Sequence, residues 1–141
     1  MYWGNAQQFE IKDSEIEFCQ GYKYLGVIFD TSRTDDKEIR LRVIQARKCI
    51  ACLNVILWSK HTRKESKLNI YNALIKSSLL YGSETWRLTE NNKRRVEATE
   101  MDALRRSSRI SRKEKIRNVT IRQQIGLVET ITKETEQNQL T

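Results

Sequence analysis

The sequence predicts a mainly α-helical protein in which an N-terminal β-hairpin, or short antiparallel strands, precedes a bundle of three or four helices. The chain of 141 residues has no proline and only five glycines, so little interrupts regular structure and helix is favoured. Apolar residues alternate with polar ones over residues 9–29 and then recur every three or four positions, which are strand and helix patterns. We expect a hairpin region over residues 1–30, a helical domain over 31–126 and a polar C-terminal tail over 127–141.

The N-terminal strands are predicted from two apolar pairs on either side of a polar turn. Phe9 and Ile11 share one face of an extended segment, and Ile16 and Phe18 repeat the pattern after residues 13–14. Such a pattern is typical of a hairpin.

A second β-rich run, residues 22–29, alternates as a single strand. We expect Gly26 to leave one side open to the close approach of a backbone or a ligand, because glycine has no side chain. One face of the predicted strand carries Leu25, Val27 and Phe29, and the other carries Tyr24, Gly26 and Ile28.

The first helix is predicted between Asp35 and Trp58. Asp35 and Glu38 have the spacing of a capping box, which marks a helix start. The opposite face of this helix carries Arg40, Arg47 and Lys48. The apolar positions follow a helical period: Ile39, Val43, Ala46, Ile50, Leu53 and Leu57.

Two further helices are predicted from their start and stop signals. Thr62 and Glu65 have capping-box spacing and begin a helix that ends at Gly82. The next helix begins near Thr89, and its apolar positions are Val96, Met101 and Leu104.

The C-terminal part holds weaker signals. Ser111 and Glu114 repeat the capping spacing, and a last short helix over residues 120–125 is closed by Gly126. We expect the polar residues 129–141 to be frayed or only marginally helical.

Positive charge is concentrated late in the chain. Lys and Arg number 26 against 18 Asp and Glu, a formal net charge of +8, and residues 105–117 hold seven basic side chains and one acidic one. Such a cluster is typical of a surface that follows nucleic-acid phosphates, although a solvated helical face is the open alternative. No aromatic residue follows Trp86, so we expect backbone contacts and no base stacking from this patch. The predicted contacts are Arg105, Arg106, Arg109, Arg112, Lys113 and Arg117, with Arg40, Arg47 and Lys48 secondary.

No group of residues in the sequence predicts a catalytic site, a metal site or a cofactor. Cys49 and Cys52 have metal or redox spacing, but both fall in the middle of the first predicted helix, and Cys19 and His61 are the only other candidate ligands for a structural zinc site. We therefore interpret the two cysteines as small apolar positions. The aspartates at 35–36 are interpreted as helix caps.

Cysteine usage and hydropathy bear on the compartment. Three cysteines without framework spacing favour a reducing environment. The first residues do not form a signal peptide, and no apolar stretch of 18 residues occurs. We expect an intracellular protein, in the nucleus or cytoplasm, that is neither secreted nor inserted in a membrane.

Several short segments, taken in order, resemble a known family. They are Tyr22–Asp30 (YKYLGVIFD), Leu57–Lys60 (LWSK), Leu79–Trp86 (LLYGSETW), Glu100–Arg106 (EMDALRR), Ile110–Arg112 (ISR) and Ile116–Asn118 (IRN). Together they resemble the region downstream of the catalytic palm in endonuclease–reverse transcriptases of animal non-LTR retrotransposons. The resemblance extends from about Phe9 to about Leu127.

The resemblance implies a layout and a ligand. In this family an aromatic-Leu-Gly hairpin forms the primer grip, so Tyr24, Leu25 and Gly26 would be its counterpart. The following helices would be a thumb-like bundle that holds an RNA–DNA hybrid through its phosphates. The family's catalytic aspartates, which bind Mg²⁺, lie upstream in an aromatic-x-Asp-Asp hairpin and an earlier strand that this sequence does not contain.

The sequence therefore predicts a non-catalytic fragment of a reverse transcriptase that binds nucleic-acid backbones, and Mg²⁺ is expected only in the full-length polymerase. One alternative is a protein-interaction fragment that self-associates through the apolar face of the hairpin and first helix. Its candidate residues are Tyr22, Tyr24, Ile28 and Trp58. Another alternative is the product of a decayed element with no function.

Overall fold

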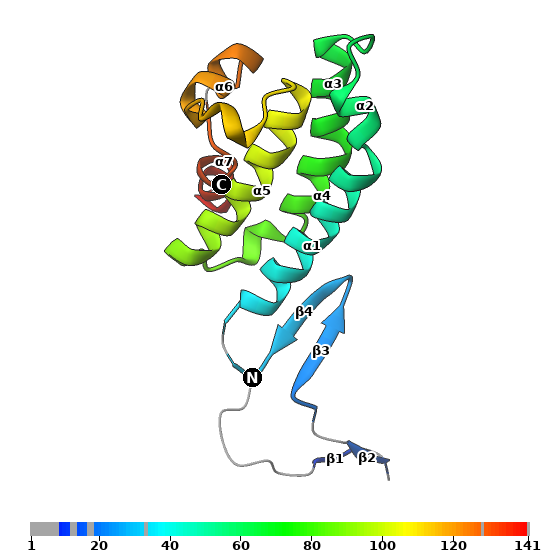
Figure 1. Cartoon of the computed structure of the whole chain (residues 1–141). Coiled ribbons are helices and arrows are strands. Elements are labelled where there is room, and N and C mark those ends of the chain that lie inside the picture. The colour runs from blue at the N-terminus through cyan, green and yellow to red at the C-terminus, as the bar shows by residue number, and fades with distance from the viewer. Residues whose placement is uncertain (1–8, 12–13, 17–18, 33, 128, 141) are drawn as a thin grey trace. The chain divides into compact units, whose positions relative to one another are not determined.

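The computed structural model describes residues 9–11, 14–16, 19–32, 34–127 and 129–140. The chain divides into two compact units, Met1–Thr34 and Asp35–Thr141. The first unit contains strands and the second contains helices (Figure 1). The predicted mainly α fold with N-terminal antiparallel strands is thereby confirmed.

The first unit contains two separate antiparallel strand pairs. In one pair, Phe9 lies opposite Ile16, while Phe18 and half of the predicted turn at 13–14 lie outside the described residues. In the other pair, Tyr22 lies opposite Phe29 and Tyr24 opposite Val27. The strands are β1 (Phe9–Ile11), β2 (Ser14–Ile16), β3 (Gly21–Tyr24) and β4 (Val27–Asp30).

The prediction of one continuous strand over residues 22–29 is wrong, because the chain reverses at Leu25 and Gly26. Their φ angles are 48° and 84°, and positive φ at both central residues is the pattern of a type I′ hairpin turn. Gly26 thus supplies a turn conformation and not an open position on a strand. The reversal also places Tyr22 and Tyr24 on the same face as their partners Phe29 and Val27.

The second unit is a bundle centred on its longest helix, α5 (Figure 1). This helix contacts α1, α2, α3, α6 and α7. The helices are α1 (Asp36–Cys52), α2 (Asn54–Trp58), α3 (Lys64–Ile70), the π-helical segment η1 (Tyr71–Lys76), α4 (Ser77–Leu80), α5 (Glu90–Ser107), α6 (Asn118–Ile125) and α7 (Ile131–Leu140). Single 3₁₀ turns lie at η2 (Ser83–Thr85) and η3 (Arg112–Glu114). Among the described residues, no helix combines the length and apolar character that a membrane crossing requires.

Two apolar clusters hold this unit together, and α5 belongs to both. Its Val96 packs in one cluster with Ile39, Val43 and Trp86, and its Met101 and Leu104 pack in the other. The second cluster also contains Ile50, Leu57, Tyr71, Ile75, Ile121 and Ile125. The predicted helical period of the first helix is confirmed by burial, except that Leu53 is only partly buried.

The first helix differs from prediction at both ends. Leu53 interrupts it, so that α1 ends at Cys52 and a short α2 follows. Asp35 occupies the N-cap position without a side-chain cap; its Oδ2 accepts a hydrogen bond from Arg87 N at 2.7 Å. Asp36 accepts from Asn92 Nδ2 at 2.6 Å. The predicted capping box is therefore wrong, because tertiary contacts to the segment around the start of α5 use these carboxylates.

Other helix ends follow the predicted signals with one exception. The Thr89 hydroxyl caps α5 by accepting from Asn92 N at 3.3 Å, and Ser111 N donates to Glu114 Oε1 at 2.8 Å. Gly82 and Gly126 follow helices where predicted, and both adopt the left-handed conformation that is common after a helix end. The exception is the helix predicted to begin with a Thr62 cap, because α3 starts at Lys64 and has no side-chain cap.

The prediction of a frayed or marginal C-terminal tail is corrected by α7. Ile131 is 1% exposed and belongs to the same apolar cluster as Val96. The Thr132 hydroxyl donates to Glu97 on α5 at 2.7 Å, and Gln139 donates to the backbone oxygens of Ser83 and Trp86, both at 2.8 Å. These contacts to distant segments, and not the weak local pattern, hold the helix in place.

This packing predicts the stability of an α7 variant. Replacing Ile131 by Ala leaves a cavity in the core, so the free energy of unfolding should fall by about 2–5 kcal/mol in urea denaturation. Leu140→Ala is the control, because Leu140 is 88% exposed and its loss should change stability by no more than about 0.5 kcal/mol. Equal stability of the two variants would contradict the packing of α7.

Candidate nucleic-acid interface

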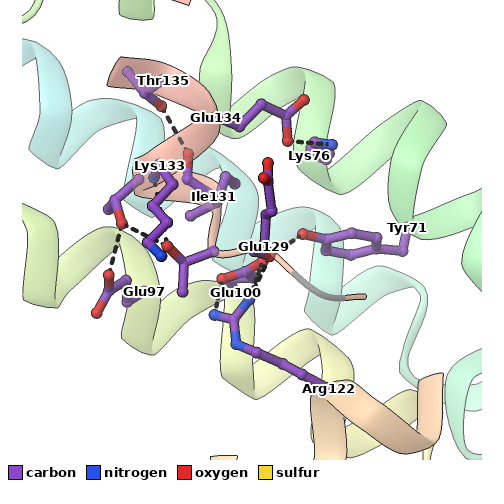
Figure 2. Close-up of polar contacts among 12 residues, drawn as sticks. Tyr71, Lys76, Glu97, Glu100, Arg122, Glu129, Ile131, Lys133, Glu134 and Thr135 are labelled. Atoms are coloured by element: carbon purple, nitrogen blue, oxygen red, sulfur yellow. Dashed lines mark hydrogen bonds and ion pairs between the residues drawn. The ribbon is translucent and has the colours of Figure 1, made fainter. Parts of the chain in front are cut away.

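A buried ion pair positions the elements around the candidate interface. Glu100 on α5 is 2% exposed and Arg122 on α6 is 7% exposed. Arg122 Nη1 donates to Glu100 Oε1 at 3.2 Å, and its Nη2 donates to Glu100 Oε2. Figure 2 shows that Tyr71 approaches the same carboxylate from another element, with its hydroxyl donating to Oε1 at 3.1 Å. One carboxylate thus joins α5, α6 and η1.

The surroundings of this carboxylate raise the pKa of Tyr71 above its ordinary value. Burial is the main cause, and the negative charge of Glu100 adds to it. The phenol therefore stays protonated and remains a donor. Arg122 Nη1 also donates to the backbone oxygen of Glu129 at 3.0 Å, which ties the connection between α6 and α7 to the same point.

Two of the predicted phosphate contacts, Arg105 and Arg106, form hydrogen bonds within the protein. Arg105 is half-buried, and its Nη2 donates to Ile116 O at 2.7 Å and to Asn118 Oδ1 at 3.0 Å. Arg106 is also half-buried, and it hydrogen-bonds Asp102 at 3.1 Å and the side chain of Asn54. Both guanidinium groups hold neighbouring segments against the end of α5.

The remaining predicted contacts project into solvent from the connection between α5 and α6. Arg109, Lys113 and Arg117 are exposed, and they have no ion-pair partner among the described residues. The side chain of Arg112 is 78% exposed and lies 3.2 Å from Asp102. Lys115, in the same connection, is exposed as well. Positive φ angles at Arg109 and Lys115, 56° and 52°, bend the chain sharply at these two positions.

A cavity of about 640 Å³ lies beside this connection, and Trp58 from α2 lines it. The tryptophan is 38% exposed. Its neighbours in the cavity wall include Arg47, Arg105, Arg106 and Arg112. The expectation of backbone contacts without base stacking stays a prediction, but the fold brings one aromatic side chain, Trp58, to the basic cluster from a distant part of the sequence.

The secondary candidates on α1 are divided by the structure. Arg47 lines the cavity beside Trp58, so the fold brings it to the main cluster. Arg40 and Lys48 are exposed on α1 and do not line this cavity.

The predicted primer-grip residues occupy the tip of the β3–β4 hairpin in the other compact unit. Leu25 is 73% exposed despite its left-handed backbone, and this conformation is strained for a leucine. The rings of Tyr22 and Tyr24 stack with centroids 6.3 Å apart and are 59% and 55% exposed. The hairpin thus presents an aromatic face and an apolar tip to solvent.

The surroundings of Cys49 and Cys52 are not those of a redox or metal site. Cys49 and Cys52 are free thiols in the last turn of α1. Burial raises the pKa of the Cys49 thiol, with a smaller contribution from Cys52, which makes it less nucleophilic at neutral pH. In the described part of the chain, no group of three or more His, Cys, Asp or Glu side chains is arranged to hold a metal ion.

Comparison with known proteins gives no match. No family model, no curated protein and no solved structure matches this chain.

The buried ion pair predicts how much stability is lost when Arg122 is replaced. Arg122→Met leaves Glu100 buried without a counter-charge, so the free energy of unfolding should fall by about 3–5 kcal/mol. The double variant Glu100→Leu/Arg122→Met removes both charges and should recover part of this loss. Urea denaturation of the single and double variants measures both effects, and additive losses would show that the two side chains are not coupled.

Proposed function

We propose that the helical unit binds the sugar-phosphate backbone of an RNA–DNA hybrid or similar duplex without sequence preference. The observation that carries this proposal is the cation-bearing connection between α5 and α6. Arg109, Arg112, Lys113, Lys115 and Arg117 are all exposed along it. Of these, only Arg112 has a carboxylate partner among the described residues. Exposed cations of this kind release counterions when they meet phosphates, which favours binding.

The surroundings of the connection also suit a nucleic acid. Arg105 holds the far end of the connection at Ile116 and Asn118, and Arg106 ties the end of α5 to Asn54 on α2, so the cations extend from a fixed base. Trp58 offers a ring that can stack on a sugar or an exposed base near the cations. The patch therefore combines charge with one apolar contact and has no evident means of reading base edges.

This activity corresponds to that of the thumb in the reverse transcriptases that the sequence resembles. We propose that the chain is a post-palm region of such an enzyme, acting in the nucleus or cytoplasm, with Tyr24, Leu25 and Gly26 as its primer-grip hairpin. The sequence contains no aromatic-x-Asp-Asp motif, so the proposed role is binding without catalysis. Mg²⁺ would then be required by the complete polymerase and not by this region.

The proposal predicts how binding responds to salt. The triple variant Arg109→Ala/Lys113→Ala/Arg117→Ala should bind a hybrid duplex more weakly. Its slope of log affinity against log salt should fall in magnitude by about 2–3, since each lost phosphate contact removes about 0.9. Fluorescence anisotropy with a labelled hybrid at several salt concentrations measures this slope.

A matched control removes three exposed cations elsewhere on the same unit. The variant Arg87→Ala/Arg94→Ala/Lys133→Ala has the same net charge as the test variant, and its three side chains are exposed outside the α5–α6 connection. Its slope should stay close to that of the unmodified protein. A flat plot for the unmodified protein, or equal slopes for both variants, would refute the proposal.

The exposed aromatic face of the hairpin favours a second candidate function, association with a protein surface. Tyr22, Tyr24 and Phe29 share this face and are each more than 40% exposed. Exposed apolar side chains in one place are typical of interaction sites. Within the other compact unit, α1 and α2 separately expose the apolar side chains of Leu41, Ile44, Val55 and Ile56.

This second candidate predicts self-association that depends on the hairpin. Size-exclusion chromatography should show an oligomer that ignores added hybrid, and Tyr22→Ser/Tyr24→Ser should convert it to a monomer. A monomer that binds hybrid would favour the nucleic-acid function instead. The third possibility, a product with no function, would be opposed by cooperative thermal unfolding.

A further inference from the structure

A second cavity, of about 430 Å³, lies between the start of α3, the end of α5 and α6. Four cationic side chains line it: Lys60, Lys64, Lys67 and Arg109. No carboxylate is among its lining residues. The cavity therefore has a strongly positive wall without an internal counter-charge.

Lys67 is the most unusual member of this wall. It is 4% exposed, and its Nζ donates to Ser107 O at 3.3 Å. No ion-pair partner for it lies within the described residues. Burial lowers the pKa of this lysine, and the nearby Arg109 lowers it further. Lysines are rarely buried without a counter-charge, so an anion in the cavity would relieve an unfavourable arrangement.

The other lining groups indicate which anion fits. Ser59, Thr62 and Ser108 also line this cavity, and serine and threonine hydroxyls can donate hydrogen bonds to the oxygens of an anion. A phosphate monoester carries close to two negative charges and three acceptor oxygens, which matches several cations and neutral donors better than a carboxylate does.

The rest of the cavity has room for an organic group. Its volume lies in the usual range for small-molecule sites, about 300–1,000 Å³. Leu68, Tyr71, Leu104 and Ile125 form an apolar part of the lining. A base or sugar attached to the phosphate would find an apolar contact there.

We propose that this cavity binds the phosphomonoester of a nucleotide, either free or at the end of a nucleic-acid strand. This goes beyond backbone binding, because an internal phosphodiester carries a single charge and two bulky substituents, whereas a terminal group enters a concave site. The cavity shares only Arg109 with the exposed cations proposed to contact the duplex.

The first experiment compares ligands by isothermal titration calorimetry. Adenosine 5′-monophosphate should bind, inorganic phosphate should bind more weakly, and adenosine should not bind. Two blunt duplexes of one sequence, one with and one without 5′-phosphates, show whether the phosphomonoester comes from a strand end or from a free nucleotide. Tighter binding of the phosphorylated duplex assigns the site to strand ends, and equal binding of both duplexes assigns it to free nucleotides. Equal affinity for adenosine and adenosine 5′-monophosphate, or no binding of the latter, would overturn the proposal.

The second experiment uses variants of the cavity wall. Lys67→Met removes the charge and keeps an unbranched side chain only one heavy atom shorter, and Lys64→Gln removes a charge at an exposed position. Each should weaken adenosine 5′-monophosphate binding by about tenfold, the usual effect of one charged hydrogen bond. Lys133→Met, at an exposed position of α7 outside the cavity, is the control and should bind as the unmodified protein does. Unchanged affinity in both cavity variants would refute the site.

The two proposals fail in different ways. Salt-dependent hybrid binding without any phosphomonoester binding would refute the cavity and leave the interface in place. Phosphomonoester binding together with a flat salt plot for the hybrid would refute the interface and leave the cavity in place.

Discussion

Glu100 is the residue on which the arrangement of the helical unit depends. A carboxylate buried to 2% exposure must be paired, because an unpaired charge in the interior is strongly unfavourable. Arg122 and Tyr71 meet this requirement from two other elements, and Arg122 also holds the backbone before α7. The apolar clusters on α5 supply most of the driving force, but apolar burial has no direction. The hydrogen bonds to Glu100 therefore decide how α6 and η1 sit against α5 (Figure 2).

The packing of α5 and α6 also determines which basic side chains stay exposed and can contact a ligand. Arg122, Arg105 and Arg106 form contacts within the protein, so the basic residues divide into internal and external groups. The external ones follow the connection whose two ends are held by α5 and α6. Tyr71 links the buried ion pair to the cationic cavity, because its hydroxyl donates to Glu100 while the residue also lines the cavity. The buried pair thus supports both proposed phosphate-binding surfaces.

Local sequence signals predicted much of the fold and part of the candidate site. The helical period placed Ile39, Ala46 and Ile50 correctly in the core, and glycine marked two helix ends. The predictions failed where distant groups competed with local ones. Asp35 had the spacing of a cap but bonds the backbone of Arg87, and a polar tail became α7 because Ile131 found a place in the core. Nothing in the local pattern of Trp58 or Lys67 indicated that each would line a cavity beside basic residues.

The sequence by itself determined the fold class, the place of the strands ahead of the helices, and the concentration of positive charge between residues 105 and 117. These follow from composition and period, which act over a few residues. Only the tertiary structure decided which arginines face inward, that Trp58 joins the basic cluster, and that Lys67 is buried in a cavity without a carboxylate. Such facts depend on contacts between segments separated by dozens of residues. Those contacts arise when buried charges and apolar faces find partners in the folded chain.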